Sequence, residues 1–135
     1  GSVISRADLS EENKRPMAAE TWAHGIDTVG GEILSNVIKG LKYSGSVAIC
    51  GLVASPAFST TVLPFILRNV NVLGVDSVEL PLAKKQEIWH RLATDLKPDA
   101  LDKMTTEVTL DGLSDVIDSI IQGGVSGRTL VKLDD

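Results

Sequence analysis

The sequence predicts an α/β protein built on a parallel sheet. Strand-like segments alternate with amphipathic helical segments along the 135 residues, and this alternation is typical of βαβ units. Residues 46–50 form an almost continuous apolar run, which is characteristic of a central strand in a parallel sheet. Glycines follow several of the strand-like segments, where the chain must turn into its next segment.

The expected strands are short. They cover residues 3–5, 25–29, 46–50, 71–76, 107–110 and 129–133. Residues 43–45 are expected to form a turn that leads into the strand at 46–50, and residues 54–61 should form a loop after it, because they are rich in Ser, Thr and Pro.

The clearest helix is expected directly after Gly30 and Gly31. Its apolar residues fall on one helical face, as a helix that covers a sheet requires, and they are Ile33, Leu34, Val37, Ile38 and Leu41.

Three other helices are expected. One covers residues 9–21, with Ser10 as its N-cap and Pro16 as an interruption. Another runs over residues 81–96, where Pro81 suits the first turn of a helix. The last covers residues 113–121 and ends at a pair of glycines.

The composition is that of an ordinary globular domain, with 43% hydrophobic and 23% charged residues. A formal net charge of -5 gives no basis for binding nucleic acid or an anionic membrane. No apolar stretch reaches the roughly 18 residues that span a bilayer, and no secretory signal is recognisable. We therefore expect no nucleic-acid partner and no membrane association.

Cys50 is the only cysteine in the chain. A single cysteine cannot form an internal disulfide, so a reducing, cytoplasmic setting is expected. Because Cys50 ends an apolar run and has no evident activating base, we expect a buried structural cysteine rather than a nucleophile.

No metal site is expected. A zinc ion needs about four N, S or O ligands, whereas His24 and His90 have no cysteine or carboxylate at a ligand spacing. We expect His90 to lie on the surface of its helix. Trp22 and Trp89 are expected to pack in a core or an interface rather than to stack on a ligand.

Candidate ligand contacts lie where three of the strands end, at residues 27–31, 50–52 and 74–77. In an open parallel sheet, ligands bind beyond the carboxyl ends of the strands. The glycines at these ends either allow a ligand to approach the backbone or simply make turns. Asp27 and Asp76 are either a pair of functional carboxylates or caps of their own turns. The G-x-G-x-x-G phosphate-binding fingerprint is absent from the sequence.

Several stretches, taken in order, resemble one known family. Residues 26–30 (IDTVG), 43–48 (YSGSVA) and 51–52 (GL) resemble the medium-chain dehydrogenase/reductase superfamily. Residues 60–70 (TTVLPFILRNV) and 74–78 (GVDSV) are similar to its acryloyl-CoA reductase branch, whose zinc-free members are also described as quinone oxidoreductases. Residues 88–97 and 127–132 fit the same branch, so the resemblance runs over almost the whole chain.

The resemblance implies a partial Rossmann-type parallel sheet, from the C-terminal portion of such an enzyme. Residues 3–98 would form the C-terminal half of an NADPH-binding domain. Residues 99–135 would form a β-α-β tail that returns toward a GroES-like catalytic domain not contained in this chain. The absent N-terminal half would carry the phosphate-binding glycine loop. Because the strand at 3–5 would then lack its neighbours, we expect it to be displaced or to pair abnormally.

The resemblance also implies contacts with NADPH. Arg6 would lie near the adenosine end, where a planar cation can stack on adenine or meet the 2′-phosphate. Gly51 and Leu52 would present backbone to the nicotinamide half, and Ile66 would stand in a loop region that walls the nicotinamide.

Two further NADPH contacts are implied at the end of the next strand and in the tail. They are Ser77 and Gln122, the latter at a position where relatives often carry Asn. Local explanations stay open beside these roles. Leu52 and Ile66 would then be core residues, and Ser77 would be the N-cap of the following helix.

The implied activity is hydride transfer from NADPH to an α,β-unsaturated thioester such as acryloyl-CoA, or to a quinone, without zinc. No residue stands out as a proton donor, so no catalytic residue is assigned, and the isolated chain is expected to be inactive. The alternative is a non-catalytic oligomerisation module. Its sheet edge at 71–76 would pair with a second copy, and family members commonly form dimers there.

Overall fold

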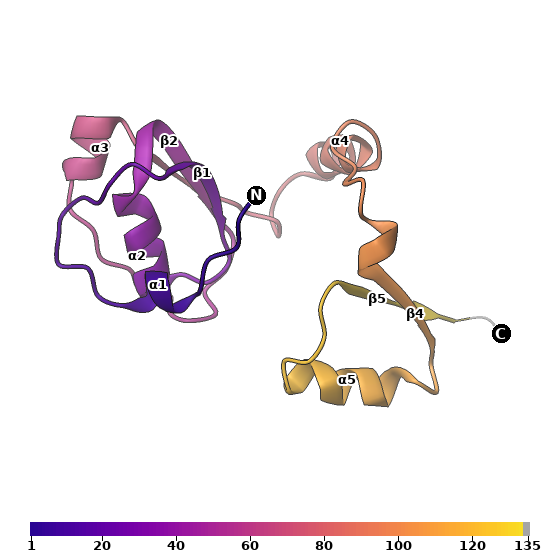
Figure 1. Cartoon of the computed structure of the whole chain (residues 1–135). Coiled ribbons are helices and arrows are strands. Elements are labelled where there is room, and N and C mark those ends of the chain that lie inside the picture. The colour runs from indigo at the N-terminus through magenta and orange to yellow at the C-terminus, as the bar shows by residue number, and fades with distance from the viewer. Residues whose placement is uncertain (134–135) are drawn as a thin grey trace. The chain divides into compact units, whose positions relative to one another are not determined.

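The computed structural model describes residues 1–133, and the chain folds into two compact units (Figure 1). The first unit is Gly1–Glu79, and the second begins at Leu80. Both combine helices with parallel strands, as expected for an α/β protein.

The first unit is a three-stranded parallel sheet with helices packed against it. Its elements are α1 (Ala7–Ser10), β1 (Trp22–Asp27), α2 (Gly31–Lys39), β2 (Leu41–Ile49), α3 (Leu63–Arg68) and β3 (Asn71–Gly74). The strand order is β1-β2-β3. The central position of β2 and the edge position of β3 are therefore confirmed.

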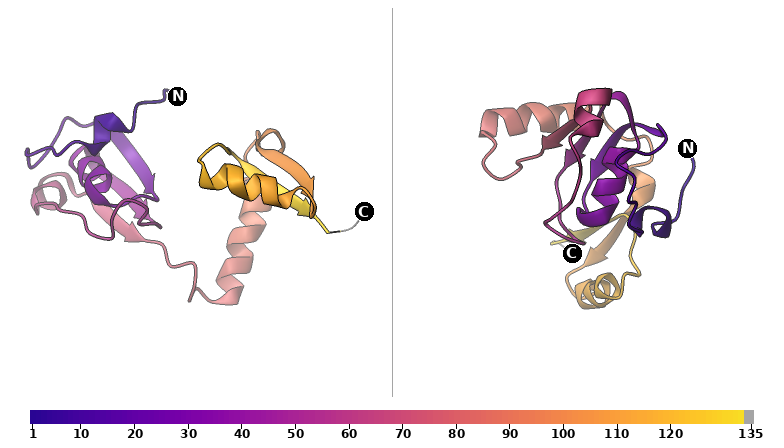
Figure 2. Two further views of the ribbon diagram at one scale, coloured as in Figure 1. Left: turned by 90° about the horizontal axis from the view of Figure 1, so that it is seen from below. Right: turned by 90° about the vertical axis from the view of Figure 1, so that its left-hand side faces the viewer.

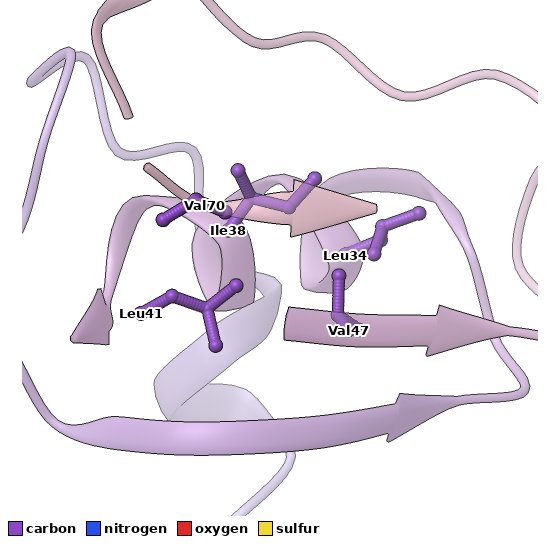
Figure 3. Close-up of a cluster of buried hydrophobic side chains, with 5 residues drawn as sticks. All are labelled: Leu34, Ile38, Leu41, Val47 and Val70. Carbon is purple, nitrogen blue, oxygen red and sulfur yellow. The ribbon is translucent and has the colours of Figure 1, made fainter. Parts of the chain in front are cut away.

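The core of this unit lies between α2 and the sheet (Figure 3). It consists of the buried side chains Leu34, Ile38, Leu41, Val47 and Val70. Three of these belong to the predicted apolar stripe, while Ile33 and Val37 lie half-buried at its margin. Complete burial of each such side chain stabilises the fold by about 1.5–3 kcal/mol.

The turn predicted at 43–45 does not separate two elements, because β2 continues through it. The pairing of β1 with β2 shifts here, since Trp22 is opposite Leu41 while His24 is opposite Ser46. The extra residues of β2 lie between these two pairs, in an irregular section of the strand where Ser44 has a φ of 58°. The turn-like sequence therefore forms a bulge.

The N-terminal segment differs most from the expectation. The predicted strand at 3–5 does not form, and Val3 is 99% exposed, in line with its expected lack of neighbours. The helix predicted at 9–21 is wrong. Only α1 is helical there, and it ends at Ser10, the residue predicted to begin the helix. Residues 11–21 instead run as irregular chain, and side chains of α2 and α3 bind three of its carbonyl groups, those of Glu11, Asn13 and Ala18.

The second unit contains a helix followed by a β-α-β arrangement. Its elements are α4 (Leu82–Ala93), the 3-10 turn η1 (Asp102–Met104), β4 (Thr105–Thr109), α5 (Leu113–Ile121) and β5 (Arg128–Lys132). β4 and β5 pair in parallel, which confirms the β-α-β tail, and α5 lies over one face of this pair (Figure 2, left).

In the second unit, the predicted bounds are correct for α5 and correct at one end for α4. α5 has the predicted bounds, and it is followed by Gly123 with a φ of 73°. α4 begins after Pro81 as expected but ends at Ala93, earlier than predicted. The Thr94 amide there bonds to the Arg91 carbonyl, which closes a tighter last turn. No described helix is long and apolar enough to cross a membrane.

Candidate functional site

The three strands of the first unit end in one row. Asp27, Ile49 and Gly74 are the last residues of β1, β2 and β3, and they are register partners. Because the strands are parallel, the loops that follow all leave from the same edge of the sheet. The structure thus brings together the three segments singled out by sequence.

Backbone hydrogen bonds join these segments beyond the strands. The Cys50 amide donates to the Asp27 carbonyl at 2.9 Å, and the Val75 amide donates to the Ile49 carbonyl at 2.9 Å. The loop after β2 folds back on the loop after β1, where the Ala54 amide donates to the Val29 carbonyl at 2.9 Å. These bonds give the edge a fixed backbone framework.

Gly30 and Gly51 are required by contacts between these loops. A Cβ at Gly30 would overlap the Ser55 carbonyl oxygen, and Gly30 also has a φ of 72°. A Cβ at Gly51 would overlap the Thr28 carbonyl oxygen. The approach of one loop to another therefore accounts for both glycines.

Asp27 and Asp76 each cap their own turn. The Asp27 Oδ2 atom is buried and accepts hydrogen bonds from the amides of Gly30 at 2.8 Å and Val29 at 3.3 Å. The Asp76 Oδ1 atom accepts from the amides of Val78 at 2.9 Å and Glu79 at 3.0 Å. The structure therefore supports the explanation in which each aspartate caps its own turn.

Leu52 is exposed next to this edge. This residue follows Gly51 directly and is 64% exposed, and its Cα lies near Gly30. It is therefore not a core residue of this unit. An exposed leucine on a rigid backbone edge is a suitable surface for one face of an aromatic ring.

Ile66 is placed differently from Leu52. It belongs to α3 rather than to a loop region, which corrects the expectation, and it is 69% exposed rather than part of the core. α3 ends at Arg68, whose guanidinium binds the Leu41 carbonyl at the start of β2. The structure therefore does not gather Ile66 with Gly51 and Leu52 at the carboxyl edge.

The remaining candidate residues belong to three different segments of the chain. Ser77 is exposed in the loop after β3, and it does not cap α4, which begins several residues later after Pro81. Arg6 is exposed immediately before α1. Gln122 follows the last residue of α5 in the second unit, and its amide donates to the Asp118 carbonyl.

Cys50 is exposed, so the expectation of a buried cysteine is wrong. It is the first residue after β2 and therefore lies beyond the packed core, with its Sγ atom 3.5 Å from the Asp27 carbonyl oxygen. His90 is exposed on α4, as expected. His24 contacts the Ser46 hydroxyl through Nδ1 at 3.0 Å. Within residues 1–133, no cluster of three or more His, Cys, Asp or Glu side chains could hold a metal ion.

A cavity of about 320 Å³ lies beside β1, and sequence inspection did not reveal it. Its lining is mainly apolar and includes Ile4, Leu9, Ile26, Val29 and Ile33. β1 is the outer strand on this side of the sheet, and Ile26 is largely exposed there. Only the three-dimensional arrangement shows that residues 2–9 approach this strand.

Comparison with known proteins agrees with the resemblance found in the sequence. The chain is 40% identical over 131 residues to the acrylyl-CoA reductase AcuI of Ruegeria pomeroyi, covering 97% of this chain and 40% of that protein. It superimposes on the YhdH oxidoreductase from Salmonella enterica in complex with NADP with a TM-score of 0.86 at 45% identity. That alignment covers 97% of this chain and 40% of YhdH. The chain is a homologue of one part of these medium-chain dehydrogenase/reductases.

A third relative supports the same assignment. The Bacillus subtilis protein YhfP, solved with NAD bound, superimposes with a TM-score of 0.88 at 37% identity and covers 96% of this chain and 40% of YhfP. No family model matches the chain. The chain spans about 40% of the length of the curated relatives it matches, so only one part of such a reductase is described by this fold.

Proposed function

We propose that this chain is part of an NADPH-dependent oxidoreductase of the acrylyl-CoA reductase type. One observation carries the proposal. The ends of β1, β2 and β3 form one row, and Leu52 is exposed beside this row on a hydrogen-bonded backbone edge. This is where a parallel α/β sheet binds its ligands.

The chain's own residues would hold and orient the cofactor. Gly51 and Leu52 would face the nicotinamide half at the end of β2, and Ser77 would approach the same edge from the loop after β3. Arg6 would meet the adenosine end. When bound, NADPH supplies a hydride to the β-carbon of an α,β-unsaturated thioester or to a quinone. The hydrogen-bonded backbone framework at this edge supports such a role.

Ile66 and Gln122 are the remaining proposed contacts. Ile66 is exposed on α3, and Gln122 lies at the end of α5. We assign residues 3–98, which extend beyond the first compact unit, to the nucleotide-binding domain. We assign residues 99–135, of which 134 and 135 lie outside the described residues, to a tail that returns to a catalytic domain. The enzyme would work without zinc, in the cytoplasm, on a small-molecule substrate.

The isolated chain is expected to be inactive. Its sequence contains no G-x-G-x-x-G fingerprint, and pyrophosphate binding in dinucleotide folds depends on such a loop at a helix N-terminus. Below, the term complete reductase means a protein in which this segment is combined with the other parts that its relatives contain. Catalysis belongs to that protein.

Fluorescence titration with NADPH tests the proposal on both proteins. The complete reductase should bind NADPH, with enhanced nucleotide fluorescence, and the isolated chain should bind weakly or not at all. Absence of binding by the complete reductase would remove the proposal. Tight binding by the isolated chain would show that the nucleotide site is contained within these residues.

A second candidate function is oligomerisation through β3. This strand lies at a sheet edge, and Leu73 and Val75 are about half exposed there. Unpaired edges readily accept a strand from another copy. Light scattering should show a dimer, and the L73K variant should be a monomer. The I121K variant, which is changed at an exposed site in the second unit, should remain a dimer. A strict monomer at high protein concentration would rule this function out.

A further inference from the structure

The irregular segment over residues 9–18 is held in place by side chains of α2 and α3. Asn36 Nδ2 donates to the carbonyl oxygens of Leu9 and Glu11, each at 2.8 Å. Further along, Lys39 Nζ donates to the Asn13 carbonyl at 2.6 Å. Near its end, Arg68 Nη2 donates to the Ala18 carbonyl at 2.8 Å. We call residues 9–18 the strap.

Asn36 differs from the other two side chains because all of its side-chain hydrogen bonds go to the strap, whereas Lys39 also pairs with Glu32 and Arg68 with Glu20. Asn36 is 7% exposed, about as buried as Lys39 at 8%, and it lies on a helix whose neighbouring buried face is apolar. A buried amide destabilises a protein unless its groups are hydrogen-bonded. Both hydrogens of Asn36 Nδ2 are used on the strap, while its Oδ1 atom has no partner. The side-chain hydrogen bonds of Asn36 are therefore directed to the strap alone.

Arg6 is fixed to the beginning of this strap through α1. The Ser5 amide donates to Asp8 Oδ2 at 3.2 Å, and the Ala7 amide donates to the Ser5 hydroxyl at 3.2 Å. The Ser10 hydroxyl donates to the Arg6 carbonyl at 2.8 Å. Residues 5–10 thus form one hydrogen-bonded turn. Asn36 holds that turn at the Leu9 carbonyl, one helical turn from Arg6.

We propose that Asn36 is a positioning residue for Arg6, and through Arg6 a determinant of selectivity for NADPH over NADH. The inference rests on the proposed function, because it takes Arg6 as a contact to the adenosine end. A guanidinium discriminates the 2′-phosphate only if it is held within hydrogen-bonding reach. α1 is four residues long and has no buried residue of its own, although Leu9 is half-buried. With so little packing, its position depends strongly on the anchor that Asn36 provides.

Lys39 and Arg68 serve as internal controls. They bind the strap at residues 13 and 18, well beyond α1. Weakening these bonds should loosen the far part of the strap and leave Arg6 in place. The K39M variant should therefore change stability without changing the preference between the two nucleotides.

The test uses the complete reductase with N36D, which keeps the shape of the side chain but removes both donors. N36A is the milder second variant, and Q86E introduces the same change from amide to carboxylate at an exposed site on α4. Loss of a hydrogen bond to a charged group weakens binding by about tenfold or more. We expect N36D and N36A to raise the KM for NADPH by about that factor and to leave the KM for NADH nearly unchanged. Q86E should change neither.

The R6A background separates positioning from direct effects. If Asn36 acts through Arg6, N36D should have no further effect on NADPH use once R6A has removed the guanidinium. An additive effect in the double variant, or an equal effect on NADPH and NADH, would overturn the inference.

Hydrogen exchange provides a readout that does not depend on catalysis. The amides of residues 7–10 should exchange faster in N36D than in Q86E, and unchanged protection would overturn the positioning role. A complete reductase that uses neither nucleotide would instead overturn the proposed function. The two failures are therefore distinguishable.

Discussion

The backbone of Gly51 lies directly against the carbonyl group of Thr28, so that no side chain fits at position 51. This contact joins the loop after β2 to the turn after β1. The Cys50 amide, one residue earlier, is bonded to the Asp27 carbonyl. The two loops therefore act as one rigid edge, and that edge is where we place the nicotinamide half of NADPH.

The G51A variant should destabilise the first unit by about 2 kcal/mol, because the added methyl group forces the two loops apart. Gly74 is a matched control at the end of the neighbouring strand, since a Cβ there would meet nothing within 4 Å. G74A should change the free energy of unfolding by less than about 0.5 kcal/mol. Denaturant unfolding of both variants measures the difference. Equal stability of the two would contradict the contact.

The D27A variant should destabilise the same edge by about 1–3 kcal/mol, because it leaves two partly buried amides without their acceptor. D27N keeps one oxygen in place and should recover a large part of the loss. D76A removes a similar cap at an exposed site, so water can replace the carboxylate and the effect should be small. Thermal unfolding checks this order of stabilities, and a larger loss in D76A than in D27A would contradict it.

Leu52 offers a direct test of the cofactor contact, because it is exposed and not needed for the core. L52E should leave the free energy of unfolding within about 0.5 kcal/mol of the parent. In the complete reductase, it should weaken NADPH binding by about tenfold or more, because a carboxylate replaces the apolar contact to the ring. V53E, at the neighbouring exposed residue, is the control. Equal NADPH affinity in L52E and V53E would count against Leu52 as a contact.

Two ion pairs, one within α4 and one between α4 and Asp95 just after it, predict a pH dependence of known sign. A hydrogen bond from Arg91 lowers the pKa of the Asp95 carboxyl, and a hydrogen bond from Lys84 lowers the pKa of Glu87. A folded-state pKa below the unfolded value contributes stability at pH values above the unfolded pKa. That contribution is lost as the pH falls through the lowered pKa.

Carboxyl-carbon NMR titration can follow Asp95 and Glu87 directly. Both should titrate below the ordinary values for their residue types, and R91Q should raise the pKa of Asp95 toward its ordinary value. High salt should act in the same direction, because both pairs are exposed. An unchanged Asp95 titration in R91Q would contradict the assigned cause.

The sequence was sufficient where local signals agree with tertiary packing. The bounds of α5 follow from its apolar spacing and from the glycines after it, where Gly123 adopts a positive φ. The central place of β2 follows from its apolar run, since such a strand must be covered on both faces. The predicted ligand edge likewise follows from parallel strands, whose ends fall in one row.

The N-terminal segment could not be predicted in this way. Its path depends on Asn36, which lies 27 residues from Leu9 in sequence, and on Arg68, which lies 50 residues from Ala18. No local pattern identifies such distant carbonyl partners, and the helical composition around Ser10 favoured the wrong structure. The contacts that require glycine at positions 30 and 51 could not be predicted from the sequence either. Both depend on loops that meet only in the fold.

The most direct test of the central claim is to follow NADPH oxidation by the complete reductase with acryloyl-CoA or a quinone as acceptor. The account predicts acceptor-dependent loss of NADPH absorbance with the complete reductase and none with the isolated chain. A complete reductase that neither binds NADPH nor reduces either acceptor would contradict it.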